Sequence, residues 1–237
     1  MGYELRNHSV FWQSPAGLAA LSWEQQVYST LCEGAFGYYA LNFSLNGLDA
    51  LRASTVQHPL HTGKDLNFDP LDWPIQNDAL DLIVLPHVLE FSPDPHGILR
   101  EAARCLRPGG ALAVTALNPR SVLALRAQSV GLGSPRSWIS RRRMIDWMRL
   151  LNLHPDRGAF GQWRPPSVQA QHFARLRWLD AAGEQWWPQM ANVYALRAIK
   201  RLSPDIRRFA PPKKSLLSIA VGAAKPAMHT VENNKND

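Results

Sequence analysis

The amino-acid sequence predicts an α/β fold with a doubly wound, mostly parallel sheet. Strand-like and helix-like segments alternate through the middle of the chain, which is typical of this class. Residues 80–85 form an apolar run of strand length, as expected for a strand that is covered on both faces. The composition agrees, because 46% of the 237 residues are apolar and 19% are charged, which excludes disordered and fibrous chains.

The N-terminal segment predicts a helical flap. Ser14-Pro15 places a cap residue before a proline, and Ser22 with Gln25 forms a capping box, so we expect helices to start at both places within residues 15–32. The segments expected next are a buried strand over 39–43, a short helix over 48–52 and a weak strand over 54–57.

The strongest signal is a strand–helix–strand unit. The strand over 80–85 is followed by Asp94 as a helix cap and by Pro95 at the first helical position. An apolar helix stripe then ends at Pro108-Gly109-Gly110, and a second strand is expected over 111–117. By the handedness rule, these two strands are parallel and joined by a right-handed crossover.

The rest of the chain completes the sheet and sets the expected boundaries. Only 24 residues, 45–68, separate the first loop from the next motif, too few for two full crossovers, so we expect a reduced second crossover in which one helix is missing or is only a turn. Further helices are expected over 140–151 and 168–181, and a final strand over 193–198. The predicted parts are an N-terminal helical flap (1–38), an α/β domain (39–202) and a flexible basic tail (203–237).

Charge, composition and cysteine spacing indicate the cellular compartment. The net charge is +7, but residues 200–237 contain eight basic and three acidic residues, so +5 of it lies in this proline-containing C-terminal stretch. The chain shows no signal-peptide pattern and no run near the ~18 apolar residues of a membrane span. Cys32 and Cys105 fit no metal or redox spacing. We therefore expect a cytoplasmic protein with no membrane association.

Residues 69–110 resemble the class I S-adenosylmethionine-dependent methyltransferases, in their small-molecule (type 11-like) branch. The resemblance rests on Asp69, on Trp73-Pro74 with its proline five residues after Asp69, on the strand over 80–85 and on Pro108-Gly109-Gly110 after the helix. Any strand–helix–strand unit would explain the periodicity, but not these residues at these offsets. The resemblance implies a Rossmann-like methyltransferase fold and S-adenosyl-L-methionine as cofactor.

The resemblance also implies where the cofactor binds. The site would lie beyond the carboxyl ends of the strands, where the sheet order reverses. Asp69 would accept a hydrogen bond from the adenine amine and Pro70 would pack on the ring, while Leu85, Pro86 and His87 would line the methionine and sulfonium side. The alternative for Asp69 is a turn cap before proline.

The first loop departs from the family pattern, which has an acid followed by alternating glycines. Asn42 stands in place of the acid, and Ser44 and Asn46 in place of the first two glycines, while Gly47 is out of phase. Because these residues are small and Asn tolerates left-handed backbone, we expect an impaired loop in which Asn42, Ser44 and Asn46 still contact the cofactor. The family's acid for the ribose diol has no counterpart, because residues 57–59 occupy its place.

Histidines raise two further questions. His58 and His61 lie near Asp65, but Pro59 breaks any helix that would align them, so we interpret them as loop histidines and expect no metal site. His87 would face the cofactor pocket, where it is either a general base or a structural histidine with satisfied hydrogen bonds.

Basic and aromatic residues are the remaining candidates. Arg141, Arg142 and Arg143 fall in the first turn of a predicted helix and oppose its dipole. We expect compensation by a nearby acid, Asp146 or Asp156, by an anionic substrate or by nucleic acid. Most of the nine tryptophans are expected in the core. The candidates to wall an apolar acceptor site are Trp12, Trp23, Trp163, Trp178, Trp186, Trp187 and Tyr194.

Three functional hypotheses follow. The first is methyl transfer from S-adenosylmethionine to a small-molecule acceptor, apolar or anionic, by in-line displacement, which needs no protein nucleophile. The second is a catalytically inactive methyltransferase-like domain that acts as a binding or interaction module, because the first loop is altered. The third is nucleic-acid binding through the three arginines and the basic tail.

Overall fold

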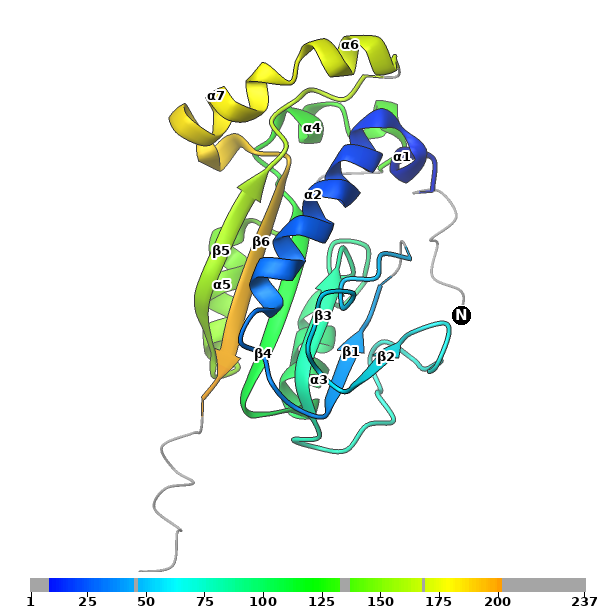
Figure 1. Ribbon diagram of the computed structural model, residues 1–237, viewed down its shortest axis with the longest axis vertical. Coiled ribbons are helices and arrows are strands. Elements are labelled where there is room, and N and C mark those ends of the chain that lie inside the picture. Colours follow the sequence, from blue (N-terminus) through cyan, green and yellow to red (C-terminus); the bar gives the residue numbers. More distant parts are fainter. Residues whose placement is uncertain (1–8, 45–46, 133–136, 168, 202–237) are drawn as a thin grey trace, which may run out of the picture. The chain divides into compact units, whose positions relative to one another are not determined.

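A six-stranded sheet forms the centre of the protein (Figure 1). The computed structural model describes residues 9–44, 47–132, 137–167 and 169–201. The strands lie in the order β2-β1-β3-β4-β6-β5. Their bounds are β1 Tyr39–Asn42, β2 His58–His61, β3 Leu80–Pro86, β4 Leu106–Leu117, β5 Leu153–Gly161 and β6 Val193–Lys200.

The sheet is parallel except at one strand. β1 pairs in parallel with β2 and β3, and β3 pairs in parallel with β4. β6 lies antiparallel between β4 and β5. The chain passes from β1 to one side, at β2, and then returns to the other side at β3, so the strand order reverses between β1 and β3. The predicted mostly parallel, doubly wound α/β sheet is confirmed, and β5 is a strand that the sequence patterns did not reveal.

Helices cover both faces of this sheet (Figure 1). Alternate residues of β3 divide between two hydrophobic clusters: Ile83 and Leu85 pack with α3 and α5, whereas Leu82 and Val84 pack with α2. The helix bounds are α1 Ser9–Gln13, α2 Pro15–Cys32, α3 Pro95–Cys105, α4 Val122–Leu125, α5 Arg141–Leu150, α6 Ala170–Arg175 and α7 Trp178–Trp186, with short 3₁₀ turns at η2 Gln128–Val130 and η4 Pro188–Met190.

Residues 15–32 of the N-terminal flap form one continuous helix, α2, rather than two. Ser14 caps α2, because its Oγ accepts a hydrogen bond from the Gly17 amide at 3.2 Å. The predicted second start at Ser22 is wrong, since α2 runs through it and Gln25 donates instead to the Asp49 carbonyl. Packing of α2 against β4, β5 and β6 overrides the local capping signal.

The described residues between β1 and β3 contain no helix, so the crossovers are reduced even further than expected. The predicted helix over 48–52 is wrong, because turns occupy 50–53 and the Asp49 carboxylate accepts a hydrogen bond from the Leu51 amide. The predicted strand over 54–57 is also wrong, since β2 begins at His58. Ala50, Leu51 and Val56 nevertheless pack with the residues of α2, so this turn segment covers part of the sheet where a helix would lie.

The remaining elements agree with the sequence in outline. The predicted helix over 168–181 is two helices, α6 and α7, and β4 begins at Leu106, before the predicted 111. The pairing of β3 with β4 shifts register over this irregular start. Both cysteines are buried free thiols. No helix among the described residues has the length and apolarity to cross a bilayer. The whole predicted tail, residues 203–237, lies outside the described residues.

Candidate cofactor site at the ends of β1 and β3

The candidate site is built where the sheet order reverses. β1 and β3 are neighbours, with Asn42 opposite Val84, so the carboxyl ends of the two strands meet at one edge. In open α/β sheets, ligands bind beyond the carboxyl ends of the strands at such a reversal. The predicted cofactor residues fall at these ends or in the segments that follow β1 and β2, with Asn46 outside the described residues.

Asn42 ends β1 and is buried, with an exposed fraction of 3%. Its Nδ2 donates to the Leu48 carbonyl at 2.8 Å and lies 3.2 Å from Nδ1 of His61. Its Oδ1 accepts no hydrogen bond among the described residues. A buried amide oxygen without a donor is costly, so this atom is a ready acceptor for a ligand N–H group.

The loop after β1 is closed by its own side chains. The Ser44 amide donates to Oγ1 of Thr62 at 3.3 Å, and the Ser44 Oγ accepts from the Leu48 amide at 3.1 Å. Gly47 has a φ of 74°, a left-handed conformation that suits glycine. The loop therefore satisfies part of its backbone internally, where a glycine loop would offer bare amides to a ligand.

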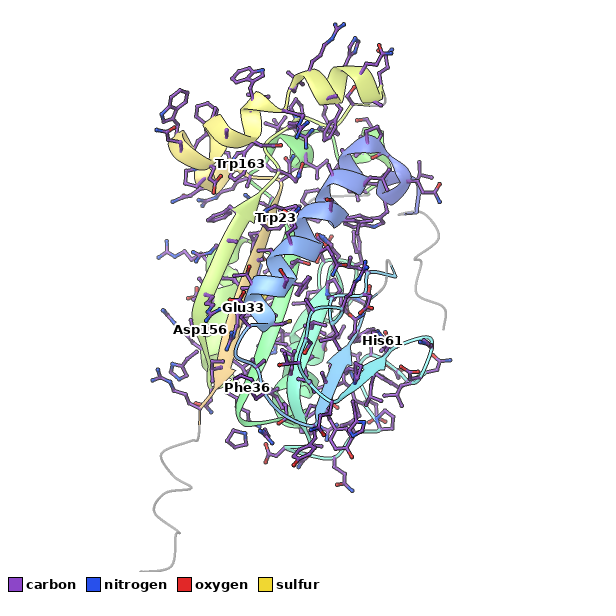
Figure 2. The ribbon with its side chains drawn as sticks, viewed as in Figure 1. Trp23, Glu33, Phe36, His61, Asp156 and Trp163 are labelled. Atoms are coloured by element: carbon purple, nitrogen blue, oxygen red, sulfur yellow. The ribbon has the colours of Figure 1, made fainter. Side chains whose placement is uncertain are left out.

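The carboxyl end of β2 is His61, not the 57–59 segment expected from the sequence (Figure 2). The expectation was wrong because the strand starts later than predicted. The His61 amide donates to Oδ2 of Asp65 at 2.8 Å, and its ring lies 3.9 Å from the Asp49 carboxylate. The end of β2 is thus polar, and carboxylates stand beside it that the sequence patterns did not assign.

Asp69 lies in an exposed turn. Its Oδ1 accepts a hydrogen bond from the Leu71 amide at 2.9 Å, so the turn-cap role is present. The Pro70 carbonyl accepts from the Trp73 ring nitrogen at 2.8 Å. This turn rests on an aromatic cluster in which the ring centroids of Phe43, Phe68 and Trp73 are 5.6 to 5.8 Å apart. Since Phe43 directly follows β1, the cluster ties the Asp69 turn to the end of that strand.

Leu85, Pro86 and His87 end β3. The Leu85 side chain packs in the core on the α3 face, and Pro86 pairs with Thr115 of β4. His87 has a φ of 54°, and its amide donates to the Thr115 carbonyl at 3.1 Å. A left-handed residue turns the chain sharply away from the strand, so His87 marks the point where β3 leaves the sheet.

Two glutamates hold the His87 ring from opposite sides. Nδ1 lies 2.5 Å from Oε1 of Glu90, and Nε2 is bonded to Oε1 of Glu24, which comes from α2. Glu90 Oε1 also accepts from the Leu117 amide at 3.0 Å. We call Glu24, His87 and Glu90 the buried triad, because no more than 1% of each residue is exposed.

Protonation of the triad follows from this geometry. Burial alone would lower the pKa of His87, but the charges and hydrogen bonds of Glu24 and Glu90 outweigh it and raise that pKa to about 10. Burial also raises the pKa of Glu24 by more than His87 lowers it. At neutral pH His87 is an imidazolium whose two N–H groups both donate to carboxylates. The geometry therefore supports a structural histidine and not a general base.

One carboxylate oxygen of each glutamate in the triad lacks a hydrogen-bond donor in the part of the chain that the structure describes. Glu24 Oε2 and Glu90 Oε2 are buried and accept no hydrogen bond among the described residues. The Trp12 ring covers His87 at a centroid distance of 4.5 Å, and the Tyr28 hydroxyl lies 3.2 Å from Oγ1 of Thr115. No cluster of the described residues has the composition and geometry of a metal site.

Sequence reasoning gave no role to Glu24 or Glu90. One signal was available for Glu24: it lies four residues from Ala20 and four from Tyr28, in the middle of the buried stripe of α2. An acid in an apolar helix stripe needs a partner. The partner comes from β3, 63 residues away in the sequence, so no local pattern identifies it.

The arginines of α5 find aromatic partners instead of the expected acids. Arg141 lies over the Phe160 ring at 5.4 Å and Arg143 over the Trp147 ring at 4.9 Å. Ser140 caps the helix by accepting from the Arg143 amide. These contacts hold two of the three arginines against aromatic rings at the start of α5.

The tryptophans divide between core and surface. Trp12, Trp138 and Trp163 are buried, as is Tyr194, whose hydroxyl donates to the Ile139 carbonyl at 2.8 Å. Trp178, Trp186 and Trp187 are exposed on α7 and at its end. Those three do not belong to the core, while Trp12 lies beside the buried triad.

Comparisons with known proteins agree with this architecture. Residues 24–114 match the family model of a methyltransferase domain. The protein YafS of Escherichia coli (strain K12) is 38% identical over 135 residues, which are 52% of this chain and 56% of that protein. The chain thus spans about half the length of this curated relative.

Solved structures share the fold at low identity. A methyltransferase of Thermotoga maritima that depends on S-adenosylmethionine is 15% identical, with a TM-score of 0.55 over 83% of this chain and 94% of that chain. One from Archaeoglobus fulgidus is 12% identical, with a TM-score of 0.55 over 84% and 100%. The [4+2]-cyclase SpnF is also similar, at 17% identity and a TM-score of 0.51 over 76% and 81%.

Residues 24–114 match the model of a methyltransferase domain, and the sheet order and these neighbours show the methyltransferase fold. Because a cyclase has the same fold, the chemistry of this chain has to be argued from its own site.

Proposed function

We propose that this protein binds S-adenosyl-L-methionine at the ends of β1 and β3 and transfers its methyl group to a small-molecule acceptor. The observation that carries the proposal is that β1 and β3 end side by side at the reversal of the sheet, within a segment that matches a methyltransferase domain. In the reaction, the carbon–sulfur bond breaks with its electron pair left on sulfur. The acceptor's lone pair forms the new bond to the methyl carbon, and the acceptor loses a proton.

The residues present fit the parts of this cofactor. The buried Oδ1 of Asn42 would accept an N–H of the methionine ammonium, which removes the cost of an unsatisfied acceptor. The Asp69 carboxylate would accept the adenine amine, with Pro70 against the ring. Polar groups at the end of β2, including His61, would meet the ribose hydroxyls. Ser44 and Asn46 would contribute from the first loop.

The acceptor would bind under α1 and α2. Phe11 and Trp12 are buried in an apolar cluster with Trp138 and Phe173, so this side of the site is aromatic. Positioning of donor and acceptor and exclusion of water supply the rate enhancement in such a displacement. These aromatic side chains favour a small apolar acceptor.

A second candidate is a binding domain without methyl transfer. It is favoured by the first loop, in which the Ser44 amide already donates a hydrogen bond to Oγ1 of Thr62. If that loop cannot open, the cofactor loses a contact and its occupancy falls. The two candidates differ in a simple property, the affinity for S-adenosylmethionine.

Calorimetric titration of the full chain with S-adenosylmethionine and with its demethylated product, S-adenosylhomocysteine, tests the proposal. Asp69→Asn is the informative variant, because the amide oxygen can still accept from Leu71 while the other oxygen becomes a donor that cannot accept the adenine amine. We expect wild-type binding in the micromolar range and a loss of about tenfold to hundredfold in Asp69→Asn.

Asp72→Asn serves as the control, because it removes one exposed carboxylate from the same turn. Its affinity should equal that of the wild-type protein. Asp69→Ala, which removes both the turn cap and the cofactor contact, should bind no better than Asp69→Asn. Absence of binding by the wild-type protein would favour the inactive binding domain, and equal affinity in all variants would remove Asp69 from the site.

A further inference from the structure

The buried triad has a net charge that fits one particular ligand chemistry. When both glutamates are ionised beside the His87 imidazolium, two negative charges face one positive charge, which leaves a net charge of −1. Burial opposes this state and raises the pKa of Glu24. A buried net charge is costly unless an opposite charge stands nearby. The buried oxygens Glu24 Oε2 and Glu90 Oε2 accept no hydrogen bond among the described residues, so the uncompensated charge has a definite location.

The position of the triad links it to the methyl donor. His87 is the residue at which β3 leaves the sheet, one strand away from Asn42. Opposite charges within a few ångströms attract strongly where water is excluded, and more weakly with distance. A cation bound at the end of β3 would therefore be stabilised by the triad, whereas an uncharged ligand of the same shape would not.

We propose that the triad of Glu24, His87 and Glu90 recognises the positive charge of the donor's sulfonium group. This inference rests on the proposed function, because it assumes that S-adenosylmethionine occupies the site. The methyl donor carries the sulfonium charge, and the product is a neutral thioether that lacks it. The triad thus favours the donor over the product and lowers the affinity for the product once the methyl group has left.

Glu24 makes this recognition depend on α2. It is the member of the triad that comes from the N-terminal helix, whereas His87 and Glu90 follow β3. Seating of α2 on the sheet brings the second carboxylate to the site and doubles the negative charge beside His87. The N-terminal segment is therefore part of the donor site and not only its cover.

The test is the ratio of the dissociation constants for S-adenosylhomocysteine and S-adenosylmethionine, measured by calorimetry on the full chain at pH 7.5. Glu24→Gln and Glu90→Gln keep the size of the side chain and remove one negative charge each. We expect each variant to lose about tenfold in the preference for the charged ligand, while its affinity for the neutral product changes little. If Glu24 and Glu90 had only a structural role, each variant would bind both ligands more weakly by the same factor, and the ratio would not change.

Two controls separate charge from packing. Glu33→Gln removes an exposed carboxylate just beyond the end of α2, where it lies 3.8 Å from Arg157 (Figure 2). Tyr28→Phe removes the hydroxyl next to Thr115, one turn from Glu24, without changing a charge. Both should keep the wild-type ratio. Circular dichroism and a thermal melt identify any variant that does not fold.

The pH dependence of the wild-type protein supplies a second measurement that needs no variant. The titratable groups around Glu24 are His87, Glu90 and Tyr28, and Tyr194 of β6 acts on Glu90. Burial raises the pKa of Glu24. A cation bound beside Glu24 should lower this pKa again, so that the carboxyl group releases a proton. Titrations in buffers of different ionisation enthalpy should show more proton release with the donor than with the product.

The outcomes distinguish the two proposals. If neither ligand binds the wild-type protein, the proposed function fails and this inference fails with it. If both ligands bind but the ratio is the same in wild type, Glu24→Gln and Glu90→Gln, the cofactor site stands and charge recognition by the triad is overturned. Equal proton release for the two ligands would count against it as well.

Discussion

Individual side chains decide the chemistry of the site through their environment more than through their type. His87 is an ordinary imidazole in the sequence, yet two carboxylates convert it into a fixed cation that has no ring nitrogen free to take up a proton. Glu24, in turn, is a charged residue in the buried stripe of a helix, which is tolerated because it meets that cation. The buried Oδ1 of Asn42 has no hydrogen-bond donor among the described residues, so it is available to accept a hydrogen bond from a ligand.

The triad predicts how stability depends on pH. The pKa of His87 is raised from 6.5 to about 10 in the folded protein, so the folded state binds more protons than the unfolded state between these values. The stabilisation from His87 is therefore complete below about pH 6.5 and is lost as the pH rises through about 10. Chemical denaturation between pH 6.5 and 10 should show the free energy of unfolding falling by a few kcal/mol.

His87→Gln isolates this effect. The variant should have a clearly flatter dependence over the same pH range, because it lacks the group that titrates. The raised pKa of Glu24 contributes a decline of the same sign, and this contribution remains in His87→Gln. An equally steep decline in His87→Gln would show that another group is responsible.

Among the elements, α2 and the short crossovers shape the site most. α2 carries Glu24 to the end of β3 and packs Tyr28 and Leu31 on the sheet, while the turn segment with Ala50, Leu51 and Val56 covers β1 where a crossover helix would lie. The short crossovers leave the Asp69 turn to rest on the Phe43, Phe68 and Trp73 rings. An aromatic cluster thus does the positioning that a longer crossover would otherwise do.

The corner between α1 and α2 gives a stability prediction. Alanine normally stabilises a helix by about 1 kcal/mol relative to glycine. At Gly17, however, an added Cβ would lie 2.1 Å from the Phe11 carbonyl oxygen, so the corner would have to shift. We expect Gly17→Ala to lower the free energy of unfolding by roughly 1–3 kcal/mol.

Urea denaturation measures this effect, with Gly34→Ala as the comparison. Gly34 has a φ of 73° and no neighbour within 4 Å of an added Cβ, so its substitution reports backbone strain without a clash. Stabilisation by Gly17→Ala would mean that α1 does not pack against the start of α2. In that case Trp12 would not be held over His87.

For the molecule as a whole, a ligand that joins α2, β1 and β3 should stabilise the domain. The candidate site takes Glu24, Asn42 and His87 from three segments that pack into one sheet structure. Ligand binding to the folded state alone raises stability by about 2.7 kcal/mol at a hundredfold excess over the dissociation constant. For a domain of this size, we expect the product or the donor to raise the melting temperature by roughly 5–10 °C.

Differential scanning fluorimetry with increasing ligand measures this shift, and Asp69→Asn should need a higher ligand concentration for the same shift. ATP, which shares the adenosine but not the amino-acid part, is a suitable comparison ligand. A calorimetric affinity without any thermal shift would contradict this prediction, because a ligand that binds only the folded domain must stabilise it.

The sequence by itself determined the sheet class, the strand–helix–strand unit over 80–117 and the resemblance to class I methyltransferases, because local periodicity and caps encode these features. The comparisons confirm the fold, and residues 24–114 match the model of a methyltransferase domain. The roles of Asp69, Pro70, Leu85 and Pro86 as cofactor contacts stay predictions. The tertiary structure decided what local patterns cannot encode. It made α2 one uninterrupted helix, left the described residues between β1 and β3 without a helix, and paired Glu24 with His87. These depend on contacts between residues far apart in the chain, and burial in a shared core sets their energies.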